Sequence, residues 1–97
     1  MIRHTVAFRL KHPAGSIEEK NFMAEAGKLR VIPGTRNFEV LAQVSAKNDF
    51  KFGLSMEFAD QAAYAFYNDH PQHVAFVRDR WVPDVAAFME IDYTVLA

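Results

Sequence analysis

Hydrophobic and polar residues alternate with a period of two near the N-terminus of the chain. In residues 2–10, IRHTVAFRL, the even positions carry Ile, His, Val, Phe and Leu, and the odd positions carry Arg, Thr, Ala and Arg. Because successive side chains of a strand point to opposite faces, this pattern predicts a strand with one strongly apolar face. The alternation recurs over residues 36–45 and 50–58, and the polar turn AKND joins these two stretches into a predicted hairpin.

The segments between these predicted strands have the spacing of apolar residues that is typical of helices. A capping box formed by Ser16 and Glu19 begins the first predicted helix, which ends at Pro33-Gly34. Asp60 is the expected N-cap of a second helix over residues 61–68. Three residues are expected to share the buried side of this second helix: Ala63, Phe66 and Tyr67.

The stretch YNDHPQHVAF, residues 67–76, predicts a break between two helices. A residue before proline avoids the helical conformation, so His70 ends one helix, and Pro71 suits the first position of the next. That next helix is expected to close at Val82-Pro83, and a last strand is predicted over residues 86–95. Tyr67 and His73 are expected on the same side of the break, facing the sheet.

The predicted order is β-α-β-β-α-(α)-β within one domain, residues 1–97. Right-handed crossovers give an antiparallel sheet of order 4-1-3-2 with the helices on one face, an α+β ferredoxin-like sandwich. The other face would carry mostly small side chains among charged ones: Thr5, Ala7, Leu41, Gly53 and Ser55. Because half of this short chain is apolar and 13% is aromatic, we expect a homodimer to cover that face.

Composition and charge narrow the classes of function. A formal net charge of −1 without a basic patch argues against nucleic-acid binding, and the lack of cysteine excludes thiolate chemistry. The alternating, charged N-terminus is no signal peptide and no apolar run could span a membrane, so a cytoplasmic protein is expected. There is no phosphate loop or serine-nucleophile motif, and His70 and His73 offer two metal ligands at best, so we expect neither cofactor nor metal.

His73 is the strongest candidate for chemistry. It falls in the first turn of a predicted helix, where the helix dipole disfavours the imidazolium and leaves the neutral ring that a general base needs. Asp92, which shares a strand face with Phe88 and Glu90, is the candidate partner for the other ring nitrogen. In a second interpretation, Asp92 and His73 only tie a helix to the sheet. Glu90 on a buried strand face indicates a wet pocket or a distorted strand.

Four stretches taken together resemble the stress-responsive A/B barrel domain (Dabb) family: IRHTVAFRLK, LRVIPGTRNFEV, HPQHVAFV and the closing IDY. Members of that family are dimeric α/β barrels, and some are plant polyketide cyclases of the olivetolic acid cyclase type. The resemblance implies catalytic roles for His73 and Tyr67, with Asp92 as the partner of the histidine and His4 in the pocket. Phe52 stands where those cyclases have another histidine, so the resemblance does not carry over their substrate.

Two functions of different class follow. The first is a cofactor-free cyclase, isomerase or lyase that acts on a small apolar carbonyl compound with a His-Asp pair as the base. Its substrate-binding residues would be His4, Val6, Phe8, Phe22, Phe52, Leu54, His70, Phe76 and Phe88. The second is a non-catalytic stress-response or ligand-binding homodimer in which these residues are simply core. A cofactor-independent monooxygenase shares the predicted fold, but no residue here distinguishes it. A solvent-accessible cavity beside His73 would favour an enzyme.

Overall fold

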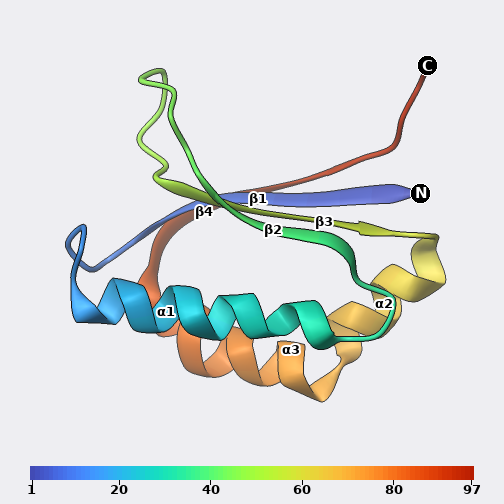
Figure 1. Ribbon diagram of the computed structural model, residues 1–97, viewed down its shortest axis with the longest axis horizontal. Helices are drawn as coiled ribbons and strands as arrows, with labels where there is room; N and C mark the ends of the chain where they lie inside the picture. The colour runs from blue at the N-terminus through green and yellow to red at the C-terminus, as the bar shows by residue number, and fades with distance from the viewer.

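The computed structural model describes residues 1–97, and its elements follow the predicted order (Figure 1). The strands are β1 (Ile2–Leu10), β2 (Arg36–Ala42), β3 (Phe52–Phe58) and β4 (Val85–Tyr93). The helical elements are α1 (Ile17–Gly27), the 3₁₀ turn η1 (Lys28–Val31), α2 (Gln61–Asp69), α3 (Pro71–Phe76), the π-helical turn η2 (Val77–Trp81) and α4 (Val82–Asp84). None of these helices has the length and apolar character that a membrane crossing requires.

The strands form one antiparallel sheet in the order β2-β3-β1-β4, which confirms the predicted ferredoxin-like arrangement. The helices cover one face of this sheet, as Figure 1 shows. The loop between β2 and β3 and the C-terminal tail extend away from the helices, on the side of the other face. The register places Val6 of β1 between Leu54 of β3 and Glu90 of β4. Side chains that are paired across β3, β1 and β4 therefore point to the same face of the sheet.

The hydrophobic core fills the space between the sheet and the helices. Strands β1 and β3 bury the even-numbered side chains that the alternation predicts: His4, Val6, Phe8, Leu10, Leu54, Met56 and Phe58. The helical layer adds Phe22, Ala26 and Leu29, which follow helical spacing. Strand β2 departs from the prediction, because it lies at the sheet edge and only Phe38 is half-buried. Its pairing is irregular near Asn37, whose φ of 50° is left-handed.

Local capping explains where the helices begin. The Ser16 hydroxyl accepts from the Glu19 N–H at 3.2 Å, and the Asp60 carboxylate accepts from the Ala63 N–H at 2.9 Å, as predicted. The break between α2 and α3 also falls at His70-Pro71. The helical stretch that begins at Pro71 continues past Pro83 to Asp84, because proline is tolerated in the first turn of α4.

The buried face of α2 differs from the predicted one. Tyr64 and Tyr67 are buried, whereas Phe66 is 53% exposed and Ala63 is half-buried. Tyr64 stacks on Phe58 with a ring separation of 4.9 Å, which turns the helix so that Phe66 points to solvent. This rotation brings a second tyrosine, Tyr64, to the candidate site.

Candidate functional site

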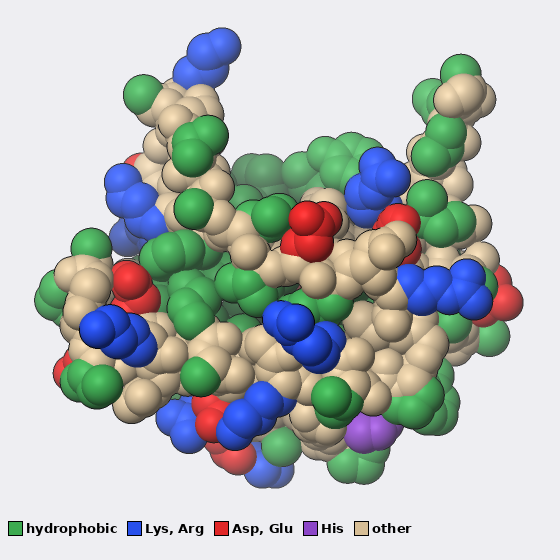
Figure 2. All heavy atoms as spheres, viewed as in Figure 1, with side chains coloured by type: hydrophobic (Ala, Val, Ile, Leu, Met, Phe, Trp, Pro, Cys, Tyr) green, Lys and Arg blue, Asp and Glu red, His purple; other side chains and the backbone are tan.

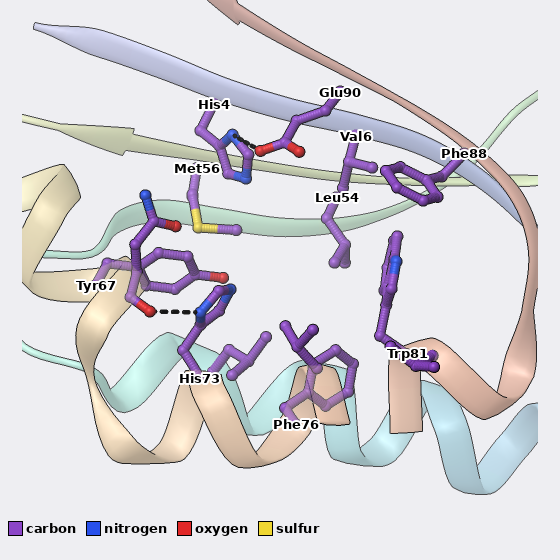
Figure 3. A pocket seen from close by; sticks show the side chains of 14 residues that line it. His4, Val6, Leu54, Met56, Tyr67, His73, Phe76, Trp81, Phe88 and Glu90 are labelled. Atoms are coloured by element: carbon purple, nitrogen blue, oxygen red, sulfur yellow. Dashed lines mark hydrogen bonds and ion pairs between the residues drawn. The ribbon is translucent and has the colours of Figure 1, made fainter. Parts of the chain in front are cut away.

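A cavity of about 400 Å³ lies between the sheet and the helical stretch that follows the break (Figure 3). Ten of its 14 lining residues are hydrophobic, and the others are His4, Asn68, His73 and Glu90. Figure 3 shows the polar side chains at one end and Phe76, Trp81 and Phe88 at the other. The volume falls in the range of about 300–1,000 Å³ that is typical of small-molecule sites. The cavity therefore suits a small, mostly apolar molecule with its polar atoms at one end.

The ring of His73 is held by a backbone group. Its Nδ1 atom lies 3.0 Å from the carbonyl oxygen of Asn68, near the end of α2. Because a carbonyl oxygen only accepts hydrogen bonds, Nδ1 carries the proton and Nε2 keeps a free lone pair. Burial lowers the pKa of His73 below its ordinary value of 6.5, so the ring is neutral at physiological pH. This is the state in which an imidazole acts as a general base.

Tyr67 places a phenol beside this imidazole. The two ring centroids are 4.4 Å apart, and the Tyr67 hydroxyl points toward His73 and the cavity in Figure 3. Burial, and then the charge of Glu90, raise the pKa of Tyr67, so the phenol keeps its proton. Only 2% of the Tyr67 surface is exposed, and no protein group accepts the hydrogen bond that its hydroxyl can donate, so that bond is available to a ligand in the cavity.

Asp92 does not hold His73, and the predicted hydrogen bond between them is wrong. Its Oδ1 atom lies 2.6 Å from Nδ1 of His4, and its Oδ2 atom accepts from the Tyr64 hydroxyl at 2.9 Å. The same hydroxyl lies 2.8 Å from His4 Nδ1. The cause is the strand register, which sets His4 directly opposite Asp92 in the β1–β4 pair. The aspartate therefore belongs to the sheet histidine and leaves the helix histidine to a backbone carbonyl.

This pairing orients His4 as well. A carboxylate oxygen accepts hydrogen bonds, so Nδ1 of His4 carries the proton and donates it in a hydrogen bond to Asp92. Nε2 then faces the cavity that His4 lines (Figure 3). The Tyr67 ring is near both imidazoles, with its centroid 6.3 Å from that of His4 and 4.4 Å from that of His73. The site therefore combines two oriented histidines with one phenol. Tyr64 was missed by the sequence analysis, although its i, i+3 spacing from Tyr67 was a usable signal.

The predicted substrate-binding residues divide into two groups. Those that line the cavity are His4, Val6, Leu54, Phe76 and Phe88. Phe8 and Phe22 instead fill the core, with 0% and 1% of their surface exposed, and Phe52 packs on Phe8 at a ring separation of 5.8 Å. His70 caps α3, where its Nδ1 accepts from the Gln72 N–H at 3.1 Å. Phe8, Phe22 and Phe52 are therefore part of the aromatic packing of the core, and His70 lies at the break between α2 and α3.

Several lining residues were not predicted, namely Leu29, Met56, Asn68, Val77, Trp81 and Val82. Three of them, Val77, Trp81 and Val82, lie on or directly after the π-helical turn η2. Such turns insert a residue into a helix and are frequent at functional sites. Here the turn directs Trp81 between Phe8 and Phe88, at ring separations of 5.1 and 5.5 Å. The π-helical turn could not be predicted from the periodicity of the sequence.

One cluster offers metal-ligand atoms. His4, Glu90 and Asp92 each place one within 4.8 Å of the others. However, Nδ1 of His4 and Oδ1 of Asp92 are only 2.6 Å apart. Two ligands of a tetrahedral zinc ion, each bound at about 2.0 Å, would lie roughly 3.3 Å apart. The spacing is thus that of a hydrogen bond, and the cluster fits a hydrogen-bonded network better than a metal centre.

The stability of the fold is expected to depend on His73 in the acid range. Because the folded pKa of His73 lies below 6.5, the unfolded chain binds more protons as the pH falls. The contribution of His73 to the free energy of unfolding is therefore fully present above its pKa in the unfolded chain. It is lost as the pH falls through its pKa in the folded protein. Urea unfolding between about pH 7 and pH 5 should show a shallower loss for His73→Gln than for the unsubstituted chain. In an NMR titration the His73 ring protons should have a midpoint below 6.5, and a higher midpoint would contradict the expectation.

Comparison with known proteins identifies the class first. The fold is that of the ferredoxin-like α+β proteins, and a Thermobifida fusca structure described as a dimeric ferredoxin-like protein aligns with a TM-score of 0.81 at 23% identity, over 97% of this chain and 90% of that one. A hydroxynitrile lyase from Passiflora edulis aligns with a TM-score of 0.84 at 16% identity, over 97% and 92% of the two chains. These likenesses concern the fold alone.

The family follows from closer matches. Residues 2–95 match the Stress responsive A/B Barrel Domain (Dabb) family. A Dabb family protein from Mesorhizobium loti is 63% identical, with a TM-score of 0.97 over 99% of this chain and 97% of that one. The chain therefore belongs to the Dabb family, as its sequence motifs predicted. No curated protein sequence matches the chain.

Proposed function

We propose that the protein is a cofactor-free enzyme that moves a proton at a small, mostly apolar carbonyl compound, in a cyclase, isomerase or lyase reaction. One observation carries the proposal: a neutral imidazole with a free Nε2 stands beside a buried phenol that lacks a hydrogen-bond acceptor, in an apolar cavity. Both groups line the cavity, so a ligand in it can take the lone pair of one and the hydrogen bond of the other.

The proposed step uses both groups at once. Nε2 of His73 takes a proton from the carbon next to the substrate carbonyl, and the electron pair of the broken C–H bond forms an enolate. The Tyr67 hydroxyl donates to the enolate oxygen as its charge develops, a contribution that is large in a water-poor site. In an isomerase the proton then returns to a different atom of the enolate system, and in a lyase the bond to the leaving group breaks and that group takes the proton. In a cyclase the enolate carbon forms a bond to a second carbonyl carbon of the same molecule, whose oxygen takes the proton. The step involves no net oxidation or reduction, so it needs no redox cofactor.

His4 adds a second proton-transfer group on the opposite wall. Its ring is held by Asp92 and Tyr64, and its Nε2 faces the same cavity. The His-Asp pair of this proposal is therefore His4 with Asp92, whereas His73 acts with a backbone carbonyl. The Passiflora edulis protein is a lyase with a similar fold, and at 16% identity it lends support only through that fold.

The half-reaction can be tested without knowing the substrate. In D₂O, an enzyme of this kind should exchange the α-protons of a bound aryl ketone such as acetophenone for deuterium. NMR would follow the loss of the methyl signal, with a panel of other small neutral aldehydes and ketones beside it. We expect protein-dependent exchange for at least one compound that binds. Binding without exchange across the whole panel would remove the enzymatic proposal.

A ligand-binding module without turnover is the second candidate. It is favoured by the Asp92 network, because Asp92, His4 and Tyr64 satisfy one another and tie β1 and β4 to α2 without any ligand. In that case the cavity would bind small molecules with no exchange, and the network would serve stability alone.

We also propose that the functional unit is a homodimer formed through the open face of the sheet. The register aligns Leu41, Gly53, Ala7 and Met89 in one row across all the strands, and this row is small or apolar. Figure 2 shows apolar side chains in the hollow between the two projecting segments, the β2–β3 loop and the C-terminal tail. Each segment carries a nearly fully exposed apolar residue, Val44 at 94% in the loop and Leu96 at 97% in the tail. A second copy would cover this surface, and the Thermobifida fusca protein of this fold is dimeric.

A charged residue in that row should disrupt the dimer. Met89 is 53% exposed on the open face, and Met89→Asp would bury an unpaired carboxylate in the interface. We expect sedimentation to show dimer for the unsubstituted chain and monomer for the variant at micromolar concentration. Val74→Asp is the matched control, because Val74 is 48% exposed on α3, on the helix side of the molecule. If both variants sediment as the unsubstituted chain does, the sheet face is not the interface.

A further inference from the structure

Formal charge is distributed very unevenly around the cavity. None of the 14 lining residues is a lysine or an arginine, and the one carboxylate among them belongs to Glu90. A second carboxylate, that of Asp92, lies directly behind His4. His73, whose ring centroid is 4.4 Å from that of Tyr67, is neutral because burial lowers its pKa. A ligand in this cavity therefore meets negative charge without any fixed positive charge.

Glu90 is placed so that a ligand would feel its charge. It lies opposite Val6 in the β1–β4 register, on the helix-facing side, and its side chain is 51% exposed at the open side of the cavity. Its Oε1 atom is 3.8 Å from Nδ1 of His4 and 3.5 Å from the Tyr64 hydroxyl. Both of those groups are already committed to Asp92 at shorter distances. No lysine or arginine pairs with the Glu90 carboxylate.

The proposed proton transfer explains this arrangement only in part, because Glu90 affects Tyr67 and His73 in different ways. The charge of Glu90 acts against an oxyanion at Tyr67, as its upward effect on the pKa of that phenol shows. Burial outweighs the other effects and lowers the pKa of His73, but the same charge acts upward on this pKa and so favours the imidazolium that forms when His73 takes a proton. The two effects of Glu90 on the chemical step oppose each other, whereas its effect on the charge of a bound ligand has one direction.

We propose that Glu90 determines the charge class of the ligand, so that the cavity takes neutral or cationic small molecules and rejects anionic ones of the same shape. An anion would lose its hydration in the apolar space and would face the Glu90 carboxylate without a compensating cation. A cation would lose hydration too, but it would gain attraction from Glu90 and from the aromatic faces at the other end. The inference deepens the proposed function, and it requires only that the cavity admits a small molecule.

Three molecules of almost equal shape test the charge class: acetophenone is neutral, benzoate is an anion and protonated benzamidine is a cation. Binding would be followed at about pH 7.5 and low salt through NMR shifts of the Trp81 indole and His73 ring protons. We expect benzoate to bind at least about tenfold more weakly than acetophenone and benzamidine. In Glu90→Gln this gap should narrow at least about fivefold, with acetophenone little affected.

The control is Glu18→Gln, which removes the same charge from an exposed position in the first turn of α1, outside the cavity. It should leave the ratio of benzoate to acetophenone affinity unchanged. The inference is wrong if benzoate binds the unsubstituted chain as tightly as acetophenone does, or if Glu90→Gln and Glu18→Gln behave alike.

The outcomes also separate this inference from the proposed function. Charge discrimination without any α-proton exchange would leave the inference standing and remove the enzyme. α-Proton exchange without any discrimination between benzoate and acetophenone in binding would do the reverse. If none of the three probes shifts the reporter signals, the cavity does not admit this class of ligand, and both proposals fail.

Discussion

Replacing His73 with alanine is expected to slow α-proton exchange of a bound carbonyl compound by about 100- to 10,000-fold. The reason is geometric: Nδ1 is committed to the Asn68 carbonyl, so Nε2 is the lone pair that meets the ligand in the cavity. The loss should appear in kcat, with little change in affinity, because alanine removes the proton acceptor and leaves the apolar walls intact. Exchange in D₂O, followed by NMR at saturating ketone, measures it directly.

Two controls separate this loss from damage to the fold. His12→Ala removes a histidine that pairs with Asp84 at 3.0 Å, outside the cavity, and should leave exchange unchanged. Unfolding of His73→Ala should show only about 1 kcal/mol of destabilisation, the value of one hydrogen bond. Exchange that survives in His73→Ala and disappears in His4→Ala would move the base to the sheet histidine. A large loss of stability with no effect on exchange would show that His73 supports the fold and is not the base.

The fold could be predicted because its signals are local. Alternation in β1 and β3 decides which side chains are buried, and the caps at Ser16 and Asp60 decide where α1 and α2 begin. The handedness of crossover connections then leaves one sheet order, which the structure has. None of these inferences required knowledge of how far one strand slides along another.

The chemistry of the site depends on the register of the β1–β4 strand pair. Asp92 and Glu90 share a strand face, and either could have faced His4 until the β1–β4 register was known. The register sets Asp92 against His4 and Glu90 against Val6, so one carboxylate orients a histidine and the other remains at the cavity. A shift of two residues could set Glu90 against His4 and move Asp92 opposite Ile2, while keeping every face assignment. The predicted partner of Asp92 was therefore wrong although its face was right.

Side-chain volume is the other quantity that periodicity does not supply. A strand pattern places Phe8 and Leu54 on the same buried face, but only packing decides which of them borders empty space. Phe8 meets Phe22 at 5.7 Å and Trp81 at 5.1 Å and is fully enclosed. Leu54 lies under a gap between helix side chains and lines the cavity. The π-helical turn that directs Trp81 into this space has no periodic signature.

Phe8→Ala should accordingly act on stability rather than on ligand binding. Phe8 is 0% exposed and contacts the rings of Phe22, Phe52 and Trp81, so its truncation leaves a void that the core cannot close. We expect the free energy of unfolding to fall by about 3–5 kcal/mol. That is a large part of the roughly 5–15 kcal/mol that stabilises a typical domain.

Phe66→Ala is the matched control, because it removes the same side chain from α2, where Phe66 is 53% exposed. Its cost should stay near about 0.5 kcal/mol, as is usual at the surface. Both variants would be unfolded with urea at one protein concentration, since a dimer makes the midpoint concentration-dependent. If Phe8 lined the cavity and Phe66 were buried, as the sequence predicted, the order of the two losses would be reversed. Acetophenone affinity would then change in Phe8→Ala, whereas the enclosed position of Phe8 implies that it stays nearly constant wherever the variant is folded.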